Sequence, residues 1–329
     1  MAYRTSSAPF FLAPGLVLGL SPAWGAPLPA ELEGGPTLAA AGAAPVPVVG
    51  LEAEVTGVAA LVAGLTPSGA TAEVGQAEVG ACLGWGALTL EGALAWGEGQ
   101  VAPATVVASV RLAGPDRALG EAPAAVTLVA GLMDVPVGLD FEAYSAADRV
   151  MVSLPAVVSG IHGGWGALGG QLQLGLGEVE LRLFGAQAYL PEPAMGALGG
   201  RLRGPLGPVT VGATAAAQLD KALVAQDVLL ELDAALGLGP VALSAEGMVR
   251  LAREAAAVGG GYVQAEYRRG WASLAARGEL LADGARVTAR AAVCLGAVLL
   301  EEALIARVEL ASDLRGADEA VLFQLVASR

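Results

Sequence analysis

The chain has 329 residues, of which 55% are hydrophobic and 15% are charged, and its mean hydropathy of +0.61 is too high for an ordinary soluble domain. A net charge of −14 makes nucleic acid a poor partner, so we expect none. With one histidine, His162, the sequence has no two-histidine metal motif, and we expect neither a metal nor a cofactor.

The N-terminus has the order of a secretory signal peptide. Arg4 is followed by an apolar run over 9–20 and then by small residues, which predicts a signal peptide over 1–25. The alternative is a buried N-terminal strand, which Pro9 and Pro14 would interrupt. Residues 26–47 are rich in Pro, Ala and Gly, and predict a linker or periplasmic lead-in before a barrel over 48–329.

A hairpin over 171–189 shows the pattern that most of the chain repeats. Leu172 and Leu174 alternate with glutamines, and beyond Gly177 the residues Leu181 and Leu183 alternate with charged ones. Because successive side chains of a strand face opposite sides, this predicts two amphipathic strands joined by a tight turn. The pattern predicts strands near 48–62, 72–84, 86–98, 103–113, 125–137, 164–175, 178–190, 195–204, 208–218, 225–236, 240–250, 259–269, 271–282, 285–296, 301–312 and 319–327.

These strands favour an all-β fold, a transmembrane antiparallel β-barrel of about 16 strands, with 14 to 18 possible. The longest stretch without charge, 150–177, is broken by Pro155, His162 and several glycines, so it does not suit a membrane-spanning helix. A soluble sandwich would also alternate, but its inner face normally carries aromatic residues, which are 5% of this chain.

The connections alternate in length, as in bacterial barrels, where short periplasmic turns alternate with longer external loops. Short turns are expected near 84–86, 176–177, 204–208, 237–240 and 269–270, and longer ones at 63–71, 137–163, 191–194, 219–224, 251–258 and 313–318. Segment 113–124 is long where this order requires a short turn. Six aromatic residues near strand ends are expected at the membrane interface: Trp85, Trp96, Trp165, Tyr189, Tyr267 and Trp271.

Charged residues that alternate with aliphatic ones are expected to line the pore, because an arginine that faces lipid at mid-membrane costs about 2–4 kcal/mol. These predicted wall residues are Glu180, Arg182, Glu231, Asp233, Glu266, Arg268, Arg277, Glu279, Arg286 and Arg290. Their mixed signs also fit cross-strand ion pairs. The two cysteines, Cys82 and Cys294, lie on distant strands and are expected to be unpaired and to face the lumen.

The longest connection, 137–163, has two possible arrangements. It could fold into the lumen as a constriction loop, with Asp140, Glu142, Asp148 and Arg149 selecting permeant ions by local potential. It could equally be an external loop with solvated charges. A serine hydrolase would need His162 with Ser153 or Ser159 and Asp148, and nothing in the sequence positions these residues together.

Segment 134–166 contains three short motifs, Asp134-Val135-Pro136-Val137-Gly138, Asp148-Arg149 and His162-Gly163-Gly164-Trp165. Together with residues 76–80 and the ending 318–329, they resemble bacterial outer-membrane porin-like barrels, including relatives of the phosphate-selective porins. The resemblance spans most of the mature chain and implies a passive diffusion channel without identifying a solute. Such barrels usually end on an aromatic residue, whereas this sequence ends on Arg329.

The sequence therefore predicts a porin-like channel for small hydrophilic solutes or ions in the outer membrane of a Gram-negative bacterium, with no enzymatic step. Its expected partners are membrane lipid and the barrel-assembly machinery, and a homotrimer is possible. The alternatives are a non-conducting barrel that acts as an adhesin or scaffold, a barrel hydrolase, and a secreted all-β binding protein.

Overall fold

A computed structural model describes residues 51–97, 100–113, 124–139, 149–188, 195–300, 303–314 and 319–328. The regions assigned to the signal peptide and the lead-in lie outside these residues, as do Asp140, Glu142, Asp148 and Tyr189. Among the described helices, none is long and apolar enough to cross a membrane.

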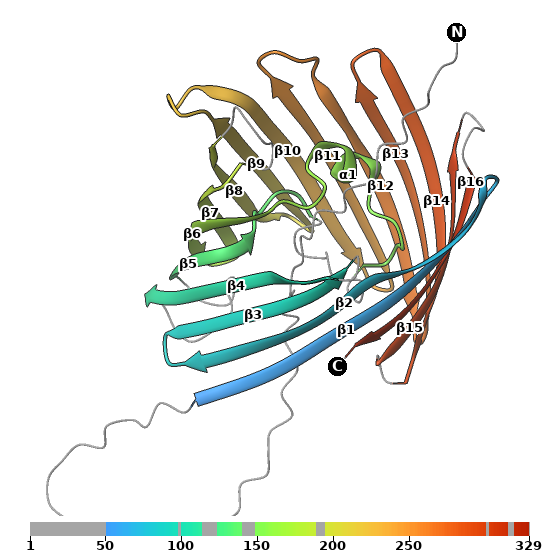
Figure 1. The fold of residues 1–329 in the computed structure, drawn as a ribbon, viewed down its shortest axis with the longest axis horizontal. Coiled ribbons are helices and arrows are strands. Elements are labelled where there is room, and N and C mark those ends of the chain that lie inside the picture. Colours follow the sequence, from blue (N-terminus) through green and yellow to red (C-terminus); the bar gives the residue numbers. More distant parts are fainter. Residues whose placement is uncertain are drawn as a thin grey trace, which may run out of the picture.

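Sixteen antiparallel strands form one closed barrel, in which each strand pairs with its neighbours in sequence and β1 pairs with β16 (Figure 1). The predicted number of strands is therefore confirmed. The strands are β1 (Leu51–Thr66), β2 (Gly69–Trp85), β3 (Leu88–Gly97), β4 (Gln100–Ala113), β5 (Ala125–Asp134), β6 (Gly166–Leu176), β7 (Val179–Ala186), β8 (Gly196–Leu206), β9 (Val209–Leu219), β10 (Ala225–Leu238), β11 (Val241–Ala252), β12 (Val258–Arg269), β13 (Ala272–Asp283), β14 (Arg286–Leu299), β15 (Leu304–Asp313) and β16 (Glu319–Ser328). The helix α1 (Ala156–Ile161) lies between β5 and β6.

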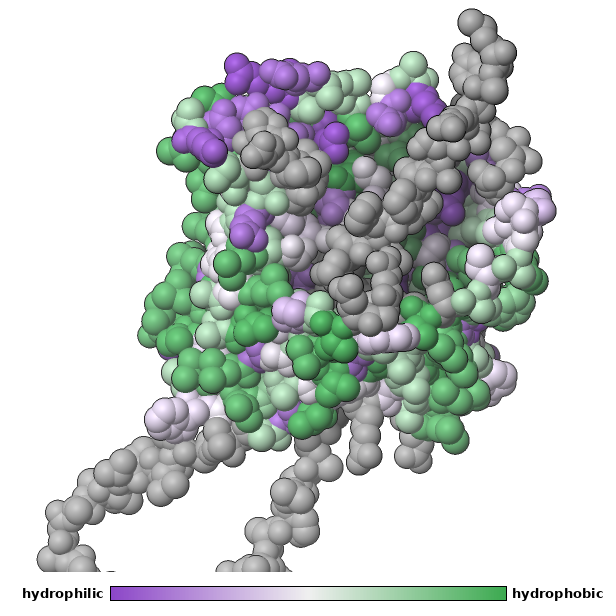
Figure 2. Space-filling view, in the orientation of Figure 1, coloured by the Kyte–Doolittle hydropathy of each residue, from purple (hydrophilic) through white to green (hydrophobic). Residues whose placement is uncertain are grey.

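The alternation of residue types determines which side of each strand faces outward. In β10, Leu230 and Leu232 are 42% and 68% exposed, whereas Glu231 and Asp233 are 2% and 5% exposed. The same division holds around the described wall, where leucines and valines cover the outer face. Hydrophobic residues cover much of the visible flank in Figure 2, and hydrophilic ones gather at its upper end. This is the reverse of a soluble protein and matches the apolar belt of a membrane barrel.

The turns agree with the predicted asymmetry at most hairpins. Two-residue turns that begin with a glycine at positive φ join β2 to β3, β6 to β7, β8 to β9, β10 to β11 and β12 to β13. The expected long loop at 63–71 is wrong, because β1 and β2 continue to a two-residue turn at Pro67 and Ser68. The cluster of Gly, Pro and Ser there resembles a loop in sequence, yet it forms a tight turn with small strand residues on both sides.

Candidate functional site

The predicted wall residues all occupy inward positions of the barrel. On each of their strands, they alternate with exposed aliphatic or small residues and share their side with buried ones. On β13, for example, Arg277 and Glu279 are 3% and 5% exposed, whereas Leu280 is 56% exposed. The sequence pattern therefore located the inward face, and the tertiary structure shows which of these side chains contact one another.

The described parts of the connection between β5 and β6 lie inside the barrel (Figure 1). Its helix α1 packs against β11, β12 and β13, and Met151 and Val152 pack with Ala292 and Ala311 of β14 and β15. In a ring of sixteen strands, β13 lies eight places from β5, so the loop crosses the lumen from one wall to the opposite one. Of the two courses that the sequence left open, the described residues of 137–163 take the inward one, and the ion selection expected of Asp140, Glu142, Asp148 and Arg149 stays a prediction.

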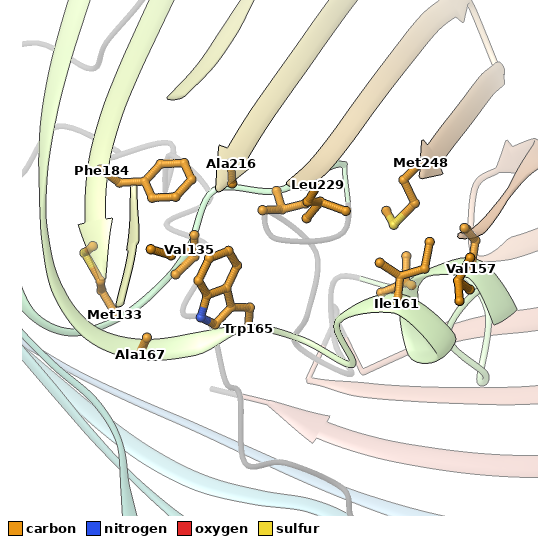
Figure 3. Packing of buried hydrophobic residues seen from close by; sticks show 14 of the residues in the cluster. Met133, Val135, Val157, Ile161, Trp165, Ala167, Phe184, Ala216, Leu229 and Met248 are labelled. Atoms are coloured by element: carbon orange, nitrogen blue, oxygen red, sulfur yellow. The ribbon is translucent and has the colours of Figure 1, made fainter. Parts of the chain in front are cut away.

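An apolar cluster holds the loop against the inner wall (Figure 3). The loop residues Val135, Val157, Ile161 and Trp165 are at most 3% exposed, and they pack among inward side chains of the wall. Those wall side chains include Phe184, Ala197, Ala216, Leu229, Met248 and Tyr262. Trp165 was expected at the membrane interface, and this was wrong: it lies inside, edge-on to Phe184, and its indole N–H donates to the Gln187 carbonyl at 3.1 Å.

Glu309 of β15 holds residues 152 and 153 of the loop by accepting hydrogen bonds from their backbone. Its carboxylate is 0% exposed and accepts the N–H groups of Val152 at 2.7 Å and Ser153 at 3.1 Å, as well as the Ser153 hydroxyl. A carboxylate that accepts several hydrogen bonds holds its partners strongly, because each hydrogen bond to a charged group contributes about 1.5–3 kcal/mol to stability. Glu309 therefore acts as an anchor for the loop.

Arg277 and Glu279 of β13 hold the next turn of the loop. The Arg277 guanidinium donates to the Ser153 carbonyl at 3.0 Å and to the Leu154 carbonyl at 3.3 Å. Glu279 accepts the N–H of Ala156, the first residue of α1, and pairs with Arg277 at 3.3 Å. Both residues were predicted to line the pore, and the structure places them beneath the loop.

Glu246 of β11 contacts the start of the loop. Its carboxylate accepts the N–H of Leu139 at 3.1 Å and the hydroxyl of Tyr262 at 3.1 Å. Gly138 has φ +73° and lies directly against this carboxylate, where a Cβ atom would collide with it. The loop thus requires glycine at this position, both for its backbone conformation and for space.

A second charged group lies along β8, β9 and β10. The Arg201 guanidinium, 2% exposed, contacts Glu231 at 3.0 Å and Asp233 at 2.6 Å. Thr214 bridges them, since it accepts from Arg201 and donates to Glu231. Arg201 can reach Asp233 because Gly212 lies between them and has no side chain. Glu231 and Asp233, both predicted wall residues, are therefore engaged in ion pairs.

The remaining predicted residues lie in more open parts of the wall. Glu180 pairs with Arg182 on β7, and Glu266 pairs with Arg268 on β12 at 2.9 Å, with the Arg268 side chain 60% exposed. Arg286 is exposed at the start of β14, Arg290 is half-buried on the same strand, and Arg149 is half-buried in the loop. These residues are more exposed than the Arg201 and Arg277 groups.

Sequence reasoning missed Glu246, Glu309 and Arg201, although the signal was present. Glu309 and Arg307 alternate with Val308 and Leu310, and Arg201 and Arg203 flank Leu202, in the same pattern that identified the other wall residues. Alanines at inward positions, such as Ala275, Ala292 and Ala311, are a second indication of where the loop contacts the wall. They leave the space in which the loop packs.

The structure gives Ser153 and His162 separate partners. Ser153 is bound to Glu309 and Arg277, whereas His162 Nδ1 accepts the N–H of Gly164 at 3.3 Å. Within the described ranges, no group of three or more His, Cys, Asp or Glu side chains could hold a metal ion. Cys82 and Cys294 are both free and lie on β2 and β14.

We expect acid to loosen the loop through His162, which is 8% exposed in the described structure. Burial lowers the pKa of His162 to about 4, from 6.5. Between these values the released loop binds a proton that the packed loop does not, so the packed form is fully stable above pH 6.5 and loses stability as the pH falls to 4. The loss approaches about 3 kcal/mol, at roughly 1.4 kcal/mol per pH unit.

Protease cleavage of the loop, measured from pH 7 to pH 4, tests this expectation. Cleavage should rise as the pH falls in the wild-type protein, and His162→Gln, which cannot titrate, should flatten the response. Equal pH profiles for the two proteins would contradict it.

No protein-family model matches the sequence, and no curated protein matches it. The fold is similar to that of solved outer-membrane barrels. A loop-deletion mutant of OmpT, an outer membrane protein of Vibrio cholerae, has a TM-score of 0.64 and 10% identity over 85% of this chain and 99% of that one. OmpF of Salmonella typhi, in complex with daunomycin, has a TM-score of 0.63 and 11% sequence identity over 84% of this chain and 97% of that one. A mutant of the Rh. blastica porin has a TM-score of 0.56 and 10% sequence identity over 84% of this chain and 100% of that one. The chain thus shares its fold with outer-membrane β-barrels.

Proposed function

We propose that this protein is an outer-membrane channel of the porin type, through which small hydrophilic solutes or ions diffuse passively. The observation that carries the proposal is the division of the wall, with aliphatic residues outside and charged residues inside a closed ring of sixteen strands. A loop that crosses the lumen and is anchored at its far wall supports selection by size and by local potential. The chain performs no covalent step in this proposal.

The same surface supports the proposed location. An apolar belt needs lipid around it, and the similar solved barrels are outer-membrane proteins, which supports the outer membrane of a Gram-negative bacterium and insertion by its barrel-assembly machinery. OmpT of Vibrio cholerae has been solved in a trimer form, which supports a homotrimer here as well. The kinship with phosphate-selective porins suggested by segment 134–166 stays a prediction, and phosphate permeation would test it.

Conductance of the purified full-length protein in planar bilayers tests the proposal. Steady single-channel steps are expected, and the protein should fractionate with the outer membrane and migrate differently in SDS before and after boiling. A protein that shifts on boiling but gives no steps would be a barrel without a channel.

That outcome is the second candidate, a non-conducting barrel that serves as an adhesin or scaffold. The apolar cluster inside the lumen favours it, because packed side chains there occupy space that a wide pore would leave to water. Bilayer recordings separate the two candidates directly.

Ser159 offers a local test of the channel. In α1 the residues Ala156, Val157, Val158 and Ile161 are buried against the wall, whereas Ser159 is exposed on the other side of the helix. A bulky side chain there would narrow the passage beside the loop. We expect Ser159→Trp to lower single-channel conductance and Ser159→Ala to leave it unchanged, and equal conductance of the two variants would place the solute path elsewhere.

A further inference from the structure

An open apolar groove with a volume of about 640 Å³ lies on the barrel where β15, β16, β1 and β2 run side by side. The strand register arranges its outward lining residues in two rows across these four strands. The rows are Val308, Phe323, Ala63 and Ala72, and then Ala306, Leu325, Leu61 and Val74. The groove therefore spans the seam at which the first and last strands close the barrel.

The hollow arises from side-chain size and from strand geometry. Alanines at 63, 72 and 306 stand among larger neighbours such as Phe323 and Leu61, which are 41% and 56% exposed. Ala60 and Leu61 of β1 pair with Gln76 and Val74 of β2, so Gly75 is an extra residue that makes β2 bulge beside the groove. The eight residues of the two rows belong to the outer apolar surface, and Val62, Arg307 and Gln324, at inward positions of the same strands, complete the lining. The groove is therefore open to whatever surrounds the barrel.

We propose that this groove binds an acyl chain of a membrane lipid. The proposal rests on the membrane location inferred above, but not on conduction. Hydrocarbon is the medium around the belt, and water cannot satisfy its hydrogen bonds in an apolar hollow. The volume falls within the range of small-molecule sites. A flexible chain can follow an irregular groove, whereas a second protomer would need a ridge of matching shape.

Native mass spectrometry of the delipidated full-length protein, with palmitoyl-oleoyl phosphatidylethanolamine added back, tests the proposal. The wild-type protein is expected to retain this lipid, and Ala63→Phe, which fills the groove, should lose most of the retained lipid. Ala306→Leu fills the other row with a smaller side chain, in case the phenylalanine prevents folding. Ala265→Phe makes the same change on the outer face of β12, away from the groove, and should retain lipid as the wild type does.

Three results would overturn the inference: no lipid retained by the wild type, equal retention by the filled variants, or oligomers that dissociate into protomers when the groove is filled. The last would assign the groove to a second copy of the chain. The shift on boiling in SDS shows separately whether each variant forms a barrel. A wild-type protein that lacks the shift would refute the membrane barrel itself, whereas a conducting barrel without retained lipid would refute the groove alone.

Discussion

Replacing Glu309 with alanine is expected to release the loop from the far wall and to raise single-channel conductance and current noise. The substitution leaves the N–H groups of Val152 and Ser153 without their acceptor inside the barrel. Each buried donor that loses its partner costs about 1–3 kcal/mol. The loop can avoid this cost by moving into the water of the lumen, so the packed and released forms should exchange during a recording.

Glu180→Ala is the matched control, because Glu180 is also an inward glutamate but pairs with Arg182 on its own strand. It removes the same charge without touching the loop. Protease cleavage within 149–165 should increase in Glu309→Ala and not in Glu180→Ala. If both variants conduct and are cleaved like the wild type, Glu309 does not anchor the loop.

Replacing Arg201 with methionine should lower the stability of the barrel by about 3–5 kcal/mol, the cost of breaking a buried ion pair by removing one partner. Glu231 and Asp233 would remain buried, at 2% and 5% exposure, with their shared cation gone. The urea concentration at which the folded band disappears from unboiled gels is the measurement. Adding Glu231→Gln to the variant should restore part of the loss, because one of the two buried carboxyl groups without a cation is then removed.

Arg268→Met tests whether the effect belongs to burial rather than to the loss of any arginine. Arg268 also pairs with a carboxylate, that of Glu266, but its side chain is 60% exposed. Exposed pairs contribute about 0–1 kcal/mol, so this variant should unfold close to the wild type. Equal midpoints for Arg201→Met and Arg268→Met would contradict the structural assignment of the Arg201 group.

In the proposed channel, the loop would combine a wide barrel with a narrow passage. A ring of sixteen strands encloses more space than the wall side chains fill, so an additional segment would define the passage of such a channel. Here the loop packs against inward apolar side chains of the wall, many of them alanines. Three buried carboxylates of the wall accept hydrogen bonds from its backbone N–H groups. The same carboxylates keep the polar backbone of the loop satisfied.

Much of the wall was predictable, because it follows from local alternation. On β10, Val228, Leu230 and Leu232 alternate with charged residues at a period of two, and this period predicts both the strand and its faces. The number of strands, the inward direction of residues such as Glu231 and Arg277, and most turns followed from it. The turn at Pro67 and Ser68 was missed, because small residues continue the strands there without a contrast between faces.

The sequence by itself thus determined that the chain forms a barrel and which side of each strand faces the lumen. Both features depend on the alternation of apolar and polar residues, which is set by neighbours two residues apart. Only the tertiary structure decided that segment 149–165 crosses the lumen and that Glu309, more than 150 residues from Val152 in sequence, receives it. Contacts over such distances depend on where the closed barrel places β15 relative to β5. The alternation of residues within one strand carries no information about them. The same reason explains why Arg277 and Glu279 could be recognised as inward but not as partners of the loop.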